Sequence, residues 1–523
     1  MTSGTRIATM EVGVESAVPR TRRASVAAFL TTPVGRAARL GFVGSLLVTL
    51  GSFGVGDIPR ANPWLQDASM AWVTYGHGKS LSALLFWIGV ALMVVAWVRL
   101  GRVVLAERTD APDTGDASMS GVGELRWAAA AWAAPLMVAV PVYSRDVYAY
   151  LAQGALLRDG LNPYVDGPAS QPGPLLDSMA QVWATTTAPY GPFFVAITRG
   201  VTEITGDHTI PGVLLMRLVM LPGWALAIWA VPRLAAHVGR DPRVAAWLVV
   251  FNPMLVIHLV AGPHVEMLMA GVLVAGVVLA LRGRHVSGLL VLGVAVSIKV
   301  TAGVAIPFVV WIWLAHIRAR REVRPGDVVR VFAVTVATTV AVFGVVTLLI
   351  GHGFGWLNGL GYADRIINWL TLPTAIAHLI TYVVAPFTAI PLAPVLSVSR
   401  TVGSVVLAVT LVWTWWRFRG DERSAVVGMA VAMFAVLLLE PSTLPWYYSW
   451  ALVFAGAAAI ARRWFALIVG ACVFMLIVFQ PDDSILLYEP TDLVLAAVVA
   501  ALAGWSLCRE DPLRLRRVLG RAR

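Results

Sequence analysis

The stretch VFAVTVATTVAVFGVVTLLIG at residues 331–351 decides the fold class, because it contains no Asp, Glu, Lys or Arg. A helix needs about 20 apolar residues to cross the roughly 30 Å hydrocarbon core of a bilayer. Residues 80–98 form a second charge-free stretch, and a shorter one at 424–439 depends on its polar flanks to reach the interface. Of 523 residues, 58% are hydrophobic and 13% charged, and the mean hydropathy is +0.77. A soluble protein could not bury so much apolar surface, so the sequence predicts a polytopic membrane protein.

Apolar stretches recur along the chain, and we expect an all-α protein with roughly 14 transmembrane helices. The expected spans lie near residues 37–56, 80–100, 126–142, 212–237, 243–260, 265–282, 286–299, 302–317, 328–351, 399–417, 424–440, 446–461, 464–480 and 491–508. Residues 371–399 are apolar but interrupted by prolines. One crossing there would place the basic residues 417–423 outside, so we expect this stretch to be external or re-entrant.

The 40 basic and 29 acidic residues give a formal charge of +11. The basic residues form short clusters between spans: Arg20, Arg22 and Arg23; Arg233, Arg240 and Arg243; Arg282 and Arg284; Arg318, Arg320, Arg321 and Arg324; Arg417, Arg419 and Arg423; Arg462 and Arg463; Arg514, Arg516 and Arg517. Clusters at every second loop are typical of the positive-inside rule and not of a nucleic-acid-binding stripe. They predict cytoplasmic N- and C-termini in a multi-pass protein that contacts membrane lipids and binds no nucleic acid.

These patterns divide the chain into segments. We expect a disordered cytoplasmic tail at 1–36, a transmembrane hairpin with a cytoplasmic linker at 37–125, a core at 126–351, a C-terminal transmembrane module at 352–508 and a basic cytoplasmic tail at 509–523. Within the core, residues 143–211 are expected to form an external loop with amphipathic helices at the interface, the first over 147–158. Cys472 and Cys508 lie in or next to apolar spans and predict neither a disulfide framework nor a metal site.

Asp146 opens this external loop and is the leading catalytic candidate. A carboxylate at the membrane surface can accept a proton from a sugar hydroxyl if burial or neighbours raise its proton affinity. The alternative is an interfacial Asp that pairs with Arg145 or caps the following helix.

Lys299 is the second candidate, between two short spans at the outer face. Only one other lysine, Lys79, occurs among the 40 basic residues. An ionisable group at this depth is costly and calls for an anionic partner, for which a lipid phosphate is suitable. The alternative is a lysine that snorkels to the interface.

Further polar and aromatic residues share the expected outer face. His264 and Glu266 could hydrogen-bond a sugar or act structurally, and metal binding with His258 is disfavoured because no third ligand shares the spacing. Asp364 and Arg365 could hold substrate or pair with each other. Trp446, Tyr447, Tyr148 and Tyr190 could stack on a sugar or form an ordinary aromatic belt. Phosphate-cradling glycine loops, dinucleotide fingerprints and zinc-protease motifs are missing from the sequence.

Several of these positions carry a family resemblance. The segments SRDVYAYLAQG at 144–154, NPY at 162–164, APYGP at 188–192 and HVEMLM at 264–269, with Lys299 and the Trp-Tyr pair at 446–447, resemble actinobacterial α-1,6-mannopyranosyltransferases. These are plasma-membrane enzymes of the GT-C class that use polyprenyl-phosphate-mannose, and the resemblance covers about residues 37–510. It is closer to members that elongate the mannan backbone of lipomannan and lipoarabinomannan than to those acting earlier on that chain. Val265 departs from the family, which has Asn between the His and the Glu.

The resemblance implies a GT-C fold, an active site facing the extracytoplasmic side, a lipid-anchored mannan acceptor, and no metal or other cofactor. It assigns the base to Asp146. The expected reaction is a single inverting displacement, in which Lys299, with Arg145 or Arg365, holds the phosphate, while a carrier phosphate leaves without needing a general acid. The different-class alternatives are a lipid or sugar flippase, whose sites lie near the bilayer midplane, and a binding or scaffolding protein.

Overall fold

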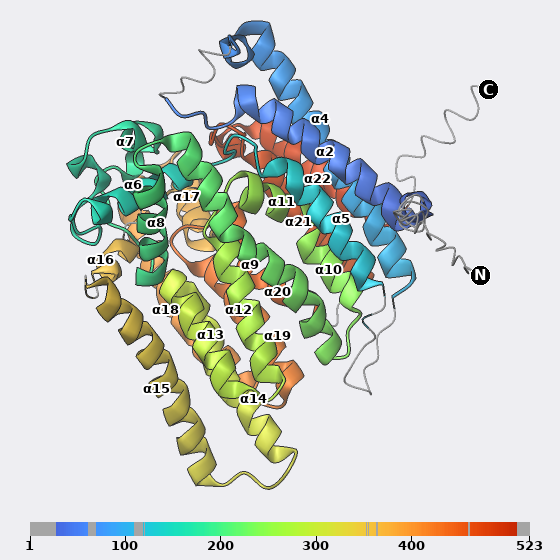
Figure 1. Cartoon of the computed structure of the whole chain (residues 1–523), viewed down its shortest axis with the longest axis vertical. Helices are drawn as coiled ribbons and strands as arrows, with labels where there is room; N and C mark the ends of the chain where they lie inside the picture. Colours follow the sequence, from blue (N-terminus) through green and yellow to red (C-terminus); the bar gives the residue numbers. More distant parts are fainter. Residues whose placement is uncertain are drawn as a thin grey trace, which may run out of the picture.

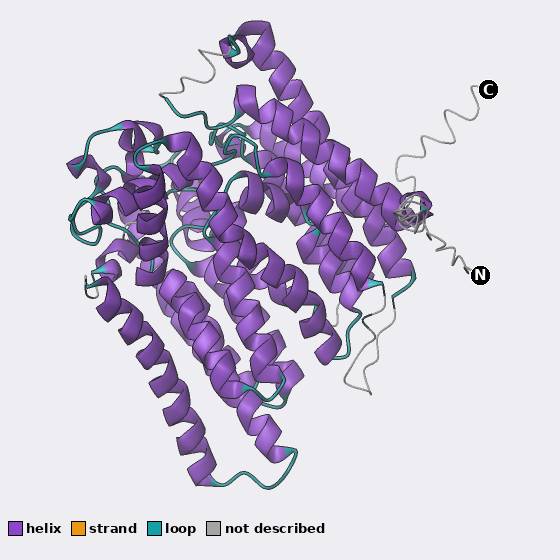
Figure 2. Cartoon of the chain, in the orientation of Figure 1, coloured by secondary structure: helices purple, strands orange, loops and turns teal. Residues whose placement is uncertain are grey.

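The computed structural model describes residues 28–60, 69–108, 119, 121–351, 353, 355–361, 365–458 and 461–509. Within these ranges the chain is helical without β-strands, apart from one isolated antiparallel bridge between Phe479 and Ile485 (Figure 2). The predicted tails and the linker centre fall mostly outside the described residues, and the division into segments stays a prediction.

The long helices pack side by side in roughly one common direction (Figure 1). Their bounds are α2 (Pro33–Val55), α4 (Gly76–Ala106), α5 (Val122–Leu136), α6 (Asp146–Arg158), α7 (Pro174–Ser178), α8 (Pro192–Thr205), α9 (Thr209–His237), α10 (Pro242–Val250), α11 (Pro253–Val256), α12 (Glu266–Leu281), α13 (His285–Ile298), α14 (Ile306–Arg318), α15 (Pro325–Ile350), α16 (Trp356–Leu360), α17 (Leu372–Val384), α18 (Leu392–Arg417), α19 (Glu422–Leu439), α20 (Ser449–Ala455), α21 (Arg462–Val478) and α22 (Pro490–Cys508).

Among the described residues, eight helices are long and apolar enough to cross a membrane, or nine if α10 and residues 253–261, bent by 49°, form one span. The predicted multi-pass architecture is therefore confirmed, whereas the count of 14 is not. Two predicted spans correspond to α12 and α13, of 16 and 14 residues, and a third contains the seven-residue α20. Nearly every residue of α12 is buried, so its apolar character reflects packing inside the protein. Hydropathy alone does not separate a core helix from a lipid-facing one.

Small residues bring α9 and α12 close together. A Cβ atom at Gly271 would lie 1.9 Å from the carbonyl oxygen of Gly223, and one at Gly223 would lie 2.2 Å from that of Met267. Close backbone approach at small residues is how helices associate when lipid surrounds them. This contact fixes α12, which begins at Glu266.

The predicted external loop folds into α6, α7 and α8, which lie together at one end of the bundle (Figure 1). α8 buries one side, as predicted for an amphipathic helix. α6 differs from that prediction, because every residue from Val147 to Leu157 is buried. The helix is covered by α8, α7 and α9 and thus holds its side chains inside the protein.

The proline-rich stretch forms α17 and the start of α18, which pack against each other. α17 has 13 residues, about 20 Å of helix, too short to cross the hydrocarbon core. α18 begins at Leu392, earlier than predicted, directly after Pro391. Proline is tolerated at a helix start because its missing N–H is not needed there.

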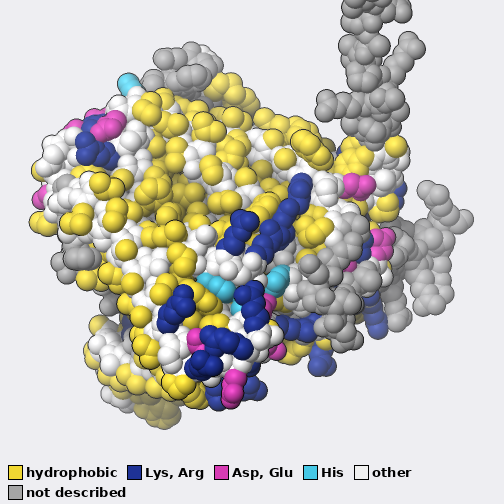
Figure 3. Space-filling model, turned by 60° about the horizontal axis from the view of Figure 1, so that its bottom comes forward, with side chains coloured by type: hydrophobic (Ala, Val, Ile, Leu, Met, Phe, Trp, Pro, Cys, Tyr) yellow, Lys and Arg dark blue, Asp and Glu magenta, His cyan; other side chains and the backbone are white. Residues whose placement is uncertain are grey.

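Arginines gather at the end of the bundle opposite α6–α8. The α14–α15 connection lies at that end (Figure 1), and Figure 3 shows groups of Lys and Arg side chains on the face that this end presents. The exposed arginines in and beside the three neighbouring turns are Arg282, Arg284, Arg318, Arg320, Arg321, Arg324, Arg417 and Arg419. Three loops predicted to share one side of the membrane therefore lie together.

Candidate active site

A cavity of about 240 Å³ lies at the α6–α8 end. Its walls come from α6, the loop before α8, the α13–α14 junction, Gly359, Ile366 and the segment 440–450. The lining residues are Asp146, Ala149, Gln153, Trp183, Thr186, Thr187, Pro189, Tyr190, Lys299, Val300, Thr301, Gly359, Ile366, Glu440, Ser442, Leu444, Tyr447 and Trp450. Asp146 and Lys299, predicted independently, thus share one cavity.

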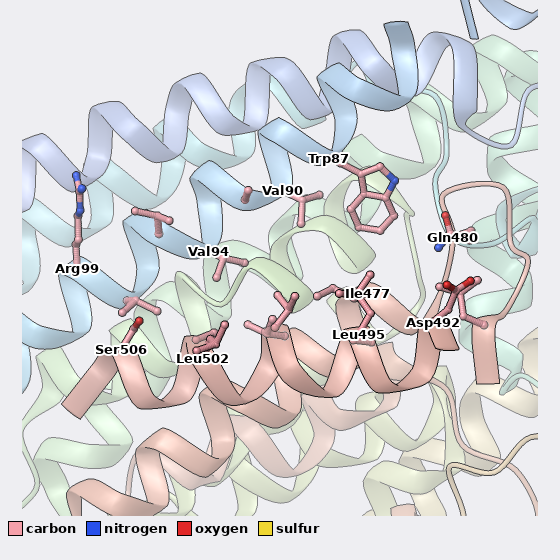
Figure 4. Close-up of a pocket in the computed structure, with 18 of the residues that line it drawn as sticks. Trp87, Val90, Val94, Arg99, Ile477, Gln480, Asp492, Leu495, Leu502 and Ser506 are labelled. Carbon is pink, nitrogen blue, oxygen red and sulfur yellow. The ribbon is translucent and has the colours of Figure 1, made fainter. Parts of the chain in front are cut away.

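A larger hollow of about 830 Å³ runs between α4 and α22 (Figure 4). Its walls are largely aliphatic, and polar groups are found mainly towards its ends, with Arg99 and Ser506 at one end and Gln480 and Asp492 at the other. This composition suits lipid tails better than a sugar, so we place the site in the smaller cavity.

Asp146 is the first residue of α6, and its backbone N–H donates to the Ser144 hydroxyl at 3.1 Å. Burial, reinforced by the negative charge of Glu266, raises the pKa of Asp146 to about 6. A carboxyl group in this state takes up a proton near neutral pH more readily than an exposed one.

His264 lies next to this carboxyl group, with Nδ1 3.6 Å from the Asp146 Oδ2 atom. Burial, together with the neighbouring His258 and Lys299, keeps the pKa of His264 well below its usual value, so the ring is neutral. The ring stacks on Trp446 with 3.7 Å between centroids. Trp446 therefore supports His264 and does not line the cavity.

The Lys299 ammonium is fixed by one carboxylate and two aromatic rings. Its Nζ atom lies 2.5 Å from Oε1 of the buried Glu266, 4.0 Å from the ring centre of Tyr447 and 5.0 Å from that of Trp450. A buried pair of this kind persists only when its charges are compensated, and the ring faces add cation–π attraction. The cation is held at a defined point of the cavity wall.

The loop before α8 positions Lys299 from the outside. The Gly191 N–H donates to the Ile298 carbonyl at 3.0 Å, and a Cβ atom at Gly191 would lie 2.3 Å from the Ser297 carbonyl oxygen. Only glycine lets the loop lie this close to the end of α13. Tyr190, the residue directly before Gly191, lines the cavity and packs edge-on against Tyr150 and Phe194.

Two predicted ligands, Arg145 and Tyr148, lie outside the cavity. Arg145 pairs with the buried Asp57 at 3.3 Å and donates to the Ser178 carbonyl at 2.9 Å. The Tyr148 hydroxyl donates to the Asp57 carbonyl at 2.7 Å. Residues 146, 149 and 153 share one face of α6, and position 148 lies on the other. Both residues brace the segment that follows α2, and neither lines the cavity, so their positions do not support the predicted phosphate role of Arg145 or the sugar role of Tyr148.

Arg365 does not line the cavity, and Asp364 lies outside the described residues. Arg365 donates to the Val182 carbonyl at 3.3 Å and to the Thr185 hydroxyl at 3.2 Å. It thereby fastens the segment that supplies Trp183 and Thr186 to the cavity wall. The prediction of phosphate binding by Arg365 is not supported by this position.

Sequence reasoning missed Glu440, which lines the cavity at the end of α19. Burial raises its pKa to about 7, and Lys299 opposes this shift. The sequence does contain a pattern that could have identified Glu440. This carboxylate comes directly after a charge-free apolar stretch, and Asp146 likewise lies just beyond an apolar stretch. Gln153, Thr186, Thr187, Thr301, Ser442, Trp183 and Trp450 also line the cavity without having been predicted as ligands. In the described part of the chain, no three His, Cys, Asp or Glu side chains are grouped to hold a metal ion.

Comparisons with known proteins agree with the resemblance. Residues 38–315 match the family described as "Alpha-(1->6)-mannopyranosyltransferase, N-terminal domain", and residues 373–509 match "MptB C-terminal domain". Alpha-(1->6)-mannopyranosyltransferase A of Mycobacterium tuberculosis is 44% identical over 92% of each chain. Its counterpart in Corynebacterium glutamicum is 36% identical, over 87% of this chain and 95% of its own.

A sibling in that organism, Alpha-(1->6)-mannopyranosyltransferase B, is 32% identical over 79% of this chain and 71% of its own. Among solved structures, an archaeal oligosaccharyltransferase from Archaeoglobus fulgidus aligns with a TM-score of 0.35 and 13% identity, over 80% of this chain and 55% of its own. The assignment rests on the sequence relatives, and the chain belongs to the α-(1→6)-mannopyranosyltransferase family of membrane glycosyltransferases.

Proposed function

We propose that the enzyme transfers mannose from polyprenyl-phosphate-mannose to an α-1,6-mannan chain at the extracytoplasmic face of the plasma membrane. The acceptor is the lipid-anchored backbone of lipomannan and lipoarabinomannan, which the enzyme elongates. The observation that carries this proposal is the shared cavity, in which an acid with raised pKa, Asp146, and a fixed cation, Lys299, line the same walls. The phosphate of a lipid-linked sugar donor needs a cation to bind it, and the hydroxyl of a sugar acceptor needs a base to take its proton.

The reaction is a single displacement at the anomeric carbon of the donor. Asp146 takes the proton from the acceptor O6 as this oxygen forms the new bond to C1. The bond between C1 and the phosphate oxygen breaks, and the electron pair leaves with the polyprenyl phosphate. Attack from the face opposite the phosphate converts a β-linked mannose into an α-linked product.

Lys299 stabilises the negative charge that grows on the departing phosphate. The ammonium has three N–H donors, and one of them is donated to Glu266. Tyr190 and Tyr447 line the cavity and remain our candidates for contacts to sugar, whereas His264 is buried behind the cavity wall beside Asp146.

The test is mannose transfer by the full-length enzyme in lipid nanodiscs, from a synthetic polyprenyl-phosphate-mannose to an α-1,6-dimannoside. Asp146→Asn should lower kcat by about 10²–10⁴, because the amide cannot take the proton. Asp177→Asn, an exposed acid on α7, is the matched control and should keep wild-type turnover. Wild-type kcat in Asp146→Asn would move the base to another residue.

The cation is tested by the pair substitution Lys299→Met with Glu266→Gln, which removes both charges and leaves no unpaired buried ion. A hydrogen bond to a charged group contributes about 1.5–3 kcal/mol, so the donor KM should rise about 10- to 100-fold. An unchanged donor KM in a folded variant would show that Lys299 does not hold the phosphate.

A further inference from the structure

Glu440 stands on a segment whose backbone is firmly held. The Thr443 hydroxyl donates to the Leu437 carbonyl at 2.6 Å, and the Asn368 side-chain amide donates to the Thr443 carbonyl at 3.0 Å. The Thr374 hydroxyl donates to the Pro441 carbonyl at 3.2 Å. These bonds tie the residues on both sides of Glu440 to α19 and to the start of α17.

The Glu440 carboxyl group, unlike the backbone around it, lacks a full set of hydrogen-bond partners. Its Oε2 atom is buried and has no hydrogen-bond partner among the described residues, while the side chain lines the cavity. An unpartnered buried acceptor costs about 1–3 kcal/mol, and a native protein keeps such a group where something else supplies the partner. A rigid support under an unsatisfied carboxyl group is the arrangement expected for ligand recognition.

Glu440 and Asp146 belong to different walls of the cavity. Asp146 comes from the start of α6, and Glu440 from the end of α19. The positive charge of Lys299 acts on both carboxyl groups, lowering the pKa of each against the larger effect of burial. Lys299 is therefore the charge common to the two acids.

We propose that Glu440 binds hydroxyl groups of the transferred hexose and so positions the donor sugar between Lys299 and Asp146. This inference rests on the proposed function, in which the phosphate lies at Lys299 and the acceptor O6 at Asp146. The hexose ring then lies between Lys299 and Asp146, within reach of the Glu440 side chain. A carboxyl group offers acceptor positions to two neighbouring hydroxyls, which fits a sugar better than an apolar ligand.

Glu440→Ala and Glu440→Gln test this role in the same nanodisc assay. We expect the alanine variant to raise the donor KM about 10- to 100-fold with the acceptor KM unchanged, as for a lost hydrogen bond of a charged group. Glutamine keeps an acceptor oxygen and nearly the same shape, so it should fall between alanine and wild type. Glu203→Gln, an exposed acid on α8, is the control and should behave as wild type.

A second readout separates binding from chemistry. Donor Kd is measured without acceptor in the Asp146→Asn background, with and without Glu440→Gln, and Glu440→Gln should weaken binding there as well. Unchanged donor affinity would overturn the proposal, whether turnover is kept or lost. A higher acceptor KM alone would also overturn it. Failure of the wild-type enzyme to transfer mannose would instead refute the proposed function.

Discussion

Asp146 is subject to opposing influences that decide its protonation at neutral pH. Burial and the charge of Glu266 favour the protonated form, and Asp483 adds a smaller effect in the same direction. The Ser144 hydrogen bond and the ammonium of Lys299 favour the charged form. The neighbouring His264 is neutral and so does not neutralise the acid. A balance of this kind places a base near its working range.

The resulting pKa predicts the pH dependence of the reaction. Below about pH 6 Asp146 is protonated and cannot accept the acceptor's proton, so kcat/KM should fall as pH decreases through that value. An exposed aspartate would give the same fall near pH 4. Glu266→Gln removes a charge that raises this pKa, and should move the acid limb to lower pH in a rate–pH profile. An acid limb that stays in place would contradict the assignment.

Of the predicted site residues, the isolated ionisable groups Asp146 and Lys299 line one cavity, whereas Arg145 and Tyr148 do not line it. Asp146 and Lys299 stood out because charges beside apolar spans are costly. Arg145 and Tyr148 shared the same motif, but the sequence did not indicate that α6 would be buried on all sides and turn them toward Asp57. The charge-free stretch before Glu440 is visible in the sequence, but its place in one cavity with Asp146 depends on the tertiary fold.

At the scale of elements, the apolar pattern predicts the positions of the long helices well. α9, α15, α19 and α22 lie within a few residues of their predicted ranges. The predicted count of 14 spans is not confirmed, and it includes α12, a 16-residue apolar helix that is almost entirely buried by its neighbours. It also could not anticipate the bend between α10 and the residues that follow, which occurs at Asn252–Pro253.

The contact between α9 and α12 gives a stability prediction. Gly271→Ala places a methyl group 1.9 Å from the Gly223 carbonyl oxygen, so the helices must separate. Overpacking of this kind costs about 1–3 kcal/mol and should lower the Tm of the purified protein. Gly344→Ala on α15 meets no atom within 4 Å and is the matched control, with an equal or higher Tm. Equal Tm values for both variants would contradict the close contact.

At the scale of the whole molecule, α6–α8 and the α14–α15 connection lie at opposite ends of the bundle (Figure 1), and the cavity is lined in part by α6. The positive-inside rule then predicts that α6–α8 face away from the cytoplasm. Lipid-linked donor and acceptor would meet there, beside the membrane surface.

Cysteine labelling in intact cells measures this orientation. In a Cys508→Ser background, where Cys472 is buried, Ser170→Cys should react with a membrane-impermeant maleimide. Glu322→Cys, exposed in the α14–α15 connection, should react only after the cells are opened. The reverse pattern would place the cavity on the cytoplasmic side.

The ammonium of Lys299 interacts electrostatically with three carboxyl groups. Those of Asp146 and Glu440 line the cavity, and that of Glu266 lies behind its wall. An arriving phosphate ester makes this neighbourhood more negative, which strengthens the hold of the acids on hydrogen ions. Donor loading and hydrogen-ion uptake are therefore thermodynamically linked, each favouring the other. In the proposed reaction, alkaline pH would therefore weaken donor binding while it deprotonates the base, and we expect an intermediate pH optimum that originates in this small group of charges.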